Sequence, residues 1–160
     1  GNLSWENGWR VAVTFKAKGL DPTKIAPAWI AEGGLNGGGV VAAQAASHET
    51  LLSSVRGNGN FNIGRGLLVG ADFDKALQNR GVGDRFRFES LSGDVSADSG
   101  RIELLDLKLA APGLTATGAL TIEPGGSASG RVVIDAKSAG VRRTTNLQVG
   151  GSHEAPQYQR

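Results

Sequence analysis

The stretch Leu114-Thr-Ala-Thr-Gly-Ala-Leu-Thr-Ile122 alternates apolar or small residues with mainly threonine, so every second side chain belongs to one face of a predicted β-strand. Val132 and Ile134 continue the apolar face after the turn at 124–126. Similar alternation, broken by glycine-rich turns, runs from Arg85 to Lys137. This pattern predicts an antiparallel meander with one aliphatic face. Such a face needs a cover, because exposed apolar patches above a few hundred Å² are rare on soluble monomers.

Further strands are expected on both sides of this stretch. Asn7-Gly8 favours a hairpin turn, followed by a strand from Trp9 to Lys18. Small residues at 37–47 predict a strand whose backbone can be approached closely, and 51–59 and 60–69 predict two more. Within 101–110 the apolar positions shift by one residue, which indicates a bulge or a change of face.

Two short helices are expected beside the strands. Asp21-Pro22 is typical of a helix start, and Ile25 and Trp29 are four residues apart, so we predict a helix over Pro22–Ala31 that Pro27 keeps short or kinked. Asp72 predicts a second start, with a helix over Phe73–Gln78. The tail after Gly140 is polar, and we expect a terminal strand or a flexible linker.

Composition sets the class of protein. The 160 residues suit one domain, and 17 Lys and Arg against 15 Asp and Glu give a net charge of +2, too weak to favour nucleic acid as a partner. Cysteine is absent, which excludes disulfides and thiolate chemistry. No apolar run approaches the roughly 20 residues of a membrane helix. Because the chain starts at Gly1 and contains no Met, we interpret it as a piece of a longer protein.

The sequence predicts neither catalysis nor a bound metal or cofactor. His48 and His153 have no neighbouring ligand residues at metal spacing, and no serine lies in a G-x-S-x-G elbow. The glycines at 57–59 and 64–66 lack the rest of a dinucleotide or phosphate-loop pattern, so we interpret them as turn or bulge glycines.

The acidic residues of the meander do not predict a metal site either. Asp94, Asp98 and Glu103 do not have the spacing of a calcium loop. Asp98-Ser99-Gly100 is more simply a hairpin turn. The aliphatic faces therefore remain the strongest pattern, and an ordinary core of sheet packed on sheet also explains them.

Five segments taken together resemble the C-terminal region of the AsmA-like envelope proteins of Gram-negative bacteria. Residues 57–73 (GNGNFNIGRGLLVGADF) are similar to the family's glycine-led strands and its G-x-x-x-G-x-D helix entry. Residues 86–93 (FRFESLSG) and Ser99 to Glu103 resemble its F-x-x-L-x-G step. Residues 107–122 and 149–156 resemble its closing strands and its terminal G-G-x-x-x-x-P signature.

The resemblance implies an inner-membrane-anchored periplasmic protein whose long curved sheet forms an apolar groove. The family is implicated in phospholipid movement between the envelope membranes and in outer-membrane biogenesis, and it has no catalytic motif to transfer. We therefore expect a mainly β fold: a curved antiparallel meander with an apolar concave face and one or two short helices. Residues 1–140 would form the AsmA-like C-terminal β domain, and 141–160 the terminal strand or tail.

On this reading the concave face binds or conducts phospholipid acyl chains, which require only a continuous apolar track. Strand parity gives the candidate lining: Val11, Val13, Phe15, Phe61, Ile63, Phe86, Phe88, Ile102, Leu104, Leu120, Ile122, Val132 and Ile134. The alternative is a structural or protein-interaction module with a closed β core, which would assist outer-membrane protein assembly through its sheet edges. A hydrolase or glycan-processing enzyme ranks third, because it would need convergent carboxylates or an activated nucleophile.

Overall fold

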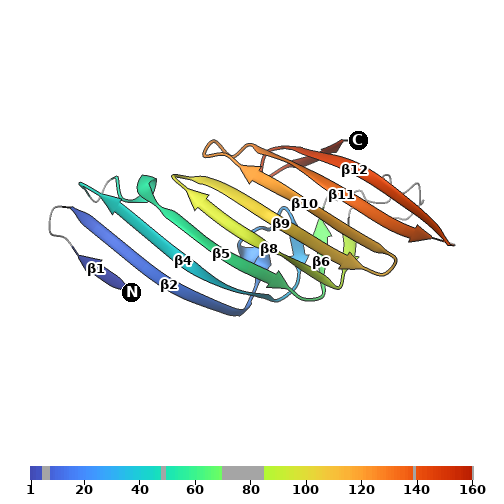
Figure 1. Cartoon of the computed structure of the whole chain (residues 1–160), viewed down its shortest axis with the longest axis horizontal. Coiled ribbons are helices and arrows are strands. Elements are labelled where there is room, and N and C mark those ends of the chain that lie inside the picture. The colour runs from blue at the N-terminus through green and yellow to red at the C-terminus, as the bar shows by residue number, and fades with distance from the viewer. Residues whose placement is uncertain (5–7, 48–49, 70–84, 139, 160) are drawn as a thin grey trace.

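The computed structural model describes residues 1–4, 8–47, 50–69, 85–138 and 140–159, and most of them lie in β-strands (Figure 1). A large antiparallel sheet has the order β1-β2-β4-β5-β8-β9-β10-β11-β12-β13. Its strands are β1 (Asn2–Ser4), β2 (Trp9–Leu20), β4 (Leu35–Ala45), β5 (Arg56–Ile63), β8 (Ser90–Asp98), β9 (Arg101–Ala111), β10 (Leu114–Ile122), β11 (Ala128–Ser138), β12 (Val141–Gly151) and β13 (Pro156–Gln159). The expectation of a mainly β protein with a large antiparallel sheet is confirmed.

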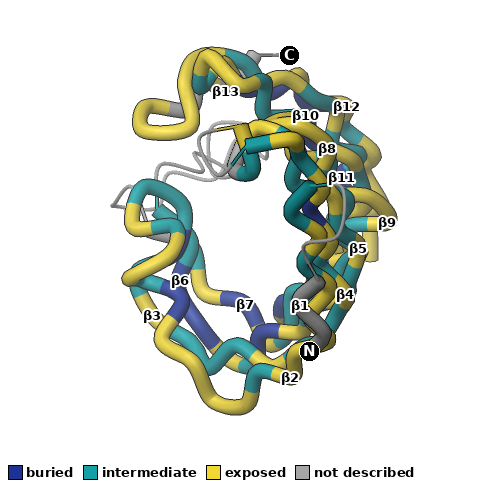
Figure 2. The backbone as a smooth tube through the Cα atoms, turned by 90° about the vertical axis from the view of Figure 1, so that its left-hand side faces the viewer, coloured by how far each residue is buried: buried dark blue, intermediate teal, exposed yellow. Residues whose placement is uncertain are grey.

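A second sheet of three strands has the order β3-β6-β7. It contains β3 (Ile30–Glu32), β6 (Gly66–Val69) and β7 (Arg85–Phe88). These strands come from the connections that leave the large sheet after β2 and after β5. Figure 2 shows the small sheet across from the strands of the large one. The two sheets share one apolar core.

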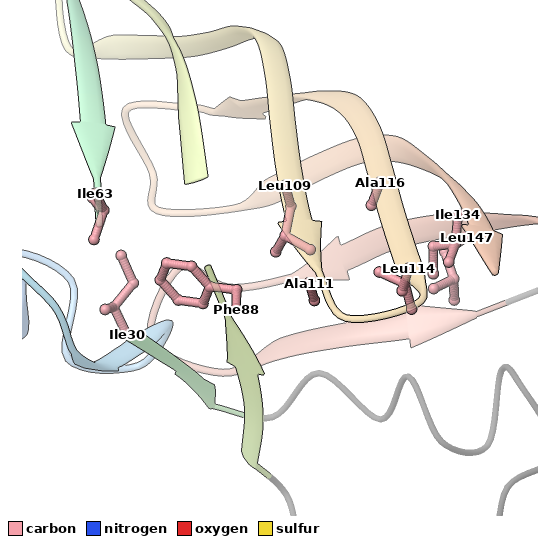
Figure 3. Packing of buried hydrophobic residues seen from close by; sticks show 9 residues of the cluster. All are labelled: Ile30, Ile63, Phe88, Leu109, Ala111, Leu114, Ala116, Ile134 and Leu147. Carbon is pink, nitrogen blue, oxygen red and sulfur yellow. The ribbon is translucent and has the colours of Figure 1, made fainter. Parts of the chain in front are cut away.

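Among the described residues, nine buried hydrophobic residues form the central cluster of this core. Two of them, Ile30 and Phe88, come from the small sheet and point toward the large one (Figure 3). The other seven belong to the large sheet: Ile63, Leu109, Ala111, Leu114, Ala116, Ile134 and Leu147. Ile134 and Ile63 are the most deeply buried, with 0% and 1% of their surface exposed. The small sheet therefore covers part of one face of the large sheet.

The helix predicted over Pro22–Ala31 is wrong in extent. A 3-10 helix spans only Pro22–Lys24, capped by Asp21, whose Oδ1 accepts a hydrogen bond from Thr23 N at 3.0 Å. The chain then turns and enters β3, where Ile30 is buried between the sheets. That burial, together with the missing N–H of Pro27, outweighs the local helix signal. Another 3-10 helix spans Leu52–Ser54, and the predicted helix Phe73–Gln78 lies outside the described residues.

The expectation that Phe86 and Phe88 begin the meander is also wrong. They lie on β7 in the small sheet, and the chain changes sheet at Glu89, whose N–H donates to Ala110 O at 2.7 Å. The meander begins one strand later, with β8. Alternation shows which residues share a face but not which sheet a strand joins, and the burial of Phe88 between the sheets favours β7 in the cover.

Of the two alternatives expected within 101–110, a bulge or a change of face, the structure has a bulge, which lies in β9. The register shifts against β8 and against β10, and Asp106 has a positive φ of 48°. Leu104 pairs with Leu120 and Leu107 pairs with Gly118, so the bulge keeps both leucines on one face.

Residues 141–159 supply two further strands of the large sheet. β12 is paired with β11 from Val141 to Val149, and β13 pairs with the end of β12.

Candidate functional site

Eleven of the thirteen candidate residues lie on one face of the large sheet. Residues that pair across neighbouring strands share a face, so the register connects them. One cross-strand row is Val13, Val41, Gly57, Ala97, Ile102, Ile122 and Ala128, and the next is Phe15, Gly39, Gly59, Val95, Leu104, Leu120, Gly130 and Val149. We call this surface the apolar face. Its predicted members are Val11, Val13, Phe15, Phe61, Ile63, Ile102, Leu104, Leu120, Ile122, Val132 and Ile134.

Glycines on the apolar face make room for the larger side chains of neighbouring strands. A Cβ atom at Gly93 would lie 2.9 Å from Leu107 Cδ2 and 3.2 Å from Phe61 Cε1. Gly130 has the same relation to Leu120, whose Cδ2 would lie 2.6 Å from such an atom. The glycine content of these strands therefore allows side chains to lie flat across the sheet.

Burial divides the apolar face into two parts. The covered part belongs to the core that the two sheets share and includes Ile63 and Ile134, which are almost completely buried. The open part includes Val13, Phe15 and Ile102, which are 41%, 43% and 36% exposed. Leu120, at 9%, is buried, and the remaining members are half-buried: Val11, Phe61, Leu104, Ile122 and Val132.

Phe86 and Phe88 do not lie on the apolar face. Phe88 is buried within the core, and Phe86 packs against that core from the same strand. Both residues therefore belong to the cover of the apolar face and not to its lining.

A hydrogen bond between distant parts of the sequence ties the segment before β3 to the C-terminal strands of the large sheet. Trp29 Nε1 donates to His153 O at 2.7 Å and joins the segment before β3 to the connection between β12 and β13. His153 N donates to Gly126 O at 2.9 Å, and the ring Nδ1 lies 3.1 Å from the same oxygen. In these contacts His153 anchors a loop. His48 lies outside the described residues.

Most charged residues of the large sheet lie on its opposite face, whereas Arg143, which pairs with Ala136, is on the side of the apolar face. The pKa of Asp135 lies below its usual value of 3.8, because the Thr144 hydroxyl donates to its carboxylate at 2.5 Å and Arg142 donates at 3.2 Å. A hydrogen bond from the Ser99 hydroxyl is the main cause that lowers the pKa of Asp98, which also pairs with Arg56 at 3.0 Å. These pairs keep this polar face solvated.

Sequence reasoning missed several members of the apolar face, including Val41, Val95 and Leu109. Val41 pairs with Val13, Val95 with Leu104, and Leu109 with Ala116. The signal was present as alternation within each strand, but strands rich in Gly, Ala and Ser contain few large residues to mark the face.

Comparison with protein-family models, curated proteins and solved structures found no match to this chain. Within the described ranges, no three His, Cys, Asp or Glu side chains form a group that could hold a metal ion. None of the helices in this part of the chain has the length and apolar character needed to cross a membrane.

Proposed function

We propose that this chain is the periplasmic part of an AsmA-like protein and binds phospholipid acyl chains along the open part of the apolar face. The main observation behind this proposal is that Val13, Phe15 and Ile102 are more than one-third exposed, although the rest of their face is mostly buried or half-buried. In this proposal the sheet is curved, with the apolar face on its concave side. Figure 2, in which the strands of the large sheet follow an arc, supports that form.

The chemistry of the open part suits acyl chains. Its members are aliphatic or aromatic, and the residues between them in the same rows include Gly39, Gly57 and Gly59, which carry no polar side chain. Transfer of a methylene group from water to an apolar surface contributes about 0.8 kcal/mol and requires no directional polar partner. Binding without catalysis is therefore the function that this surface supports best, in support of outer-membrane biogenesis and lipid homeostasis.

The alternative remains a structural or protein-interaction module that assists assembly of outer-membrane proteins. The covered part favours it, because Ile63 and Ile134 are already buried in the core to which the small sheet contributes Ile30 and Phe88. In that case the open part would bind an apolar protein segment, and no lipid would be found on it.

The test uses two neighbouring positions on β2. Phe15 is on the apolar face and Thr14 on the polar face, and both are exposed. A photo-crosslinking amino acid is placed at each position in the parent protein, and adducts formed in cells are identified by mass spectrometry. We expect phospholipid adducts at Phe15 and none at Thr14.

The two failures of this test are distinct. Protein adducts without lipid at Phe15 would favour the interaction module. Equal lipid adducts at both positions would show contact with bulk membrane and would refute a specific track. Native mass spectrometry of detergent-free material, comparing Phe15→Glu with Thr14→Glu, provides a second measurement, in which only Phe15→Glu should lose bound lipid.

A further inference from the structure

The polar face of the large sheet contains a hollow of about 530 Å³ over β4, β5, β8 and β9. This volume lies within the range of roughly 300 to 1,000 Å³ that is usual for small-molecule sites. We call it the polar hollow. Most of its side chains are polar: Asn36, Asn60, Asn62, Ser92, Asp94, Asp106 and Lys108.

Strand register places these side chains together. Asn36 pairs with Asn62, Asn62 with Ser92, and Ser92 with Lys108, so one row crosses four strands. Asn60 and Asp94 pair in the next row. Side chains that pair directly across strands stand about 5 Å apart, close enough to bind one ligand together.

The β9 bulge adds a second carboxylate to the polar hollow. Asp106 is the bulged residue, with a positive φ of 48°, and it lines the hollow near Asp94. A bulge re-aims a side chain out of the regular alternation, and Asp is one of the few residue types besides glycine that adopts positive φ readily. Without the bulge, residue 106 would follow the ordinary alternation of the strand.

The polar groups of the hollow are available to a ligand. In the part of the chain that the structure describes, the side chains of Asn60, Asp94, Asp106 and Lys108 form no hydrogen bond or ion pair. The Asn36 Oδ1 accepts from Gly19 N at 3.0 Å, and the NH₂ group of the same amide remains as a donor. The hollow thus offers carboxylate acceptors beside amide and ammonium donors.

We propose that the polar hollow binds a saccharide, a function separate from acyl-chain binding on the other face. Each sugar hydroxyl both donates and accepts, so it can donate to Asp94 or Asp106 and accept from an asparagine amide or Lys108. The polar hollow contains two carboxylates and one ammonium group, so its side chains carry a net negative charge. This charge disfavours phosphate and other anions as ligands. The described residues include no group of three ligands for a metal ion.

The experiment is an NMR titration of the ¹⁵N-labelled chain with three neutral tetrasaccharides: cellotetraose, chitotetraose and maltotetraose. At least one should give saturable shifts at the amides of residues 60–62, 92–94 and 106–108. Asp106→Asn keeps a residue type that tolerates positive φ but removes the charge, and it should weaken binding at least fivefold. Asn60→Ala should weaken binding by a similar factor.

Asn58→Ala is the matched control, because Asn58 lies on the same strand and face but does not line the hollow. It should bind with unchanged affinity. Three results would overturn the proposal: no saturable shift with any tetrasaccharide, equal weakening by Asn58→Ala, or saturable shifts with calcium chloride in place of the sugars. Phe15→Glu should retain saccharide binding, so failure of the lipid proposal and failure of this one can be distinguished.

Discussion

The division of the apolar face predicts that shortening two of its side chains to alanine will lower the free energy of unfolding by very different amounts. Ile134 is completely buried in the covered part, whereas Val13 is 41% exposed in the open part. Ile134→Ala removes three carbon atoms, a loss of about 2.4 kcal/mol in transfer free energy before any cavity term. With the cavity, we expect a loss of about 3 to 4 kcal/mol in the free energy of unfolding.

Val13→Ala removes two carbon atoms from a side chain that is already partly in water. The expected loss is therefore ~1 kcal/mol. Urea unfolding followed by tryptophan fluorescence measures both values. Val133→Ala, beside Ile134 but on the polar face, is the control and should cost less than Ile134→Ala.

One result would refute this reasoning. If Val13→Ala costs as much as Ile134→Ala, the open part is closed in solution, and an acyl track there is excluded. A small cost for Ile134→Ala would instead show that the covered part is not a packed core.

Three further predictions test other parts of the structure. Gly39→Ala should lower stability by about 2 kcal/mol or more, since a Cβ atom there would lie 2.3 Å from Asn58 O; Gly125→Ala, with no atom within 4 Å, should stay within about 0.5 kcal/mol in the same urea experiment. The lowered pKa of Asp135 contributes stability that is present above its usual pKa of 3.8 and lost as pH falls through the lower folded value, so between about pH 5 and pH 2.5 the melting temperature should fall less in Asp135→Asn than in the unmodified chain. EDTA should leave the melting temperature unchanged, and a shift of several degrees would reveal a metal site.

Sequence alone was enough for the properties that depend on alternation. Leu114, Ala116 and Leu120 are buried while Thr115 and Thr117 are exposed, as the period-two pattern requires. The β9 bulge was also visible, because a shift in apolar phase within a strand has few other causes.

Features that depend on contacts distant in sequence could not be predicted. Ile25 and Trp29 have helical spacing, yet Ile25 is 66% exposed and Trp29 donates to His153, 124 residues away. Phe86 and Phe88 alternate as in the meander, but their partners are in β6. Single-strand patterns do not specify partners, so the small sheet was missed.

The polar hollow shows the same limit for function. Asn60 and Asp94 read as ordinary solvent-facing residues, 34 positions apart in the chain, and only their register makes them neighbours. The sequence indicated an irregularity in β9. It did not indicate that the bulge there adds Asp106 to the side chains that line the polar hollow.

Leu120 is a less informative position than its clean alternation suggests. A charge at Leu120 would be penalised during folding whether the face binds lipid or forms a closed core, because only 9% of the residue is exposed. Phe15 lies in the same cross-strand row, on β2, and is 43% exposed. A glutamate there changes the surface at little cost to folding, so loss of lipid by Phe15→Glu at an unchanged melting temperature would report on binding alone. The open part, not the cleanest strand, is therefore where the lipid hypothesis must be tested.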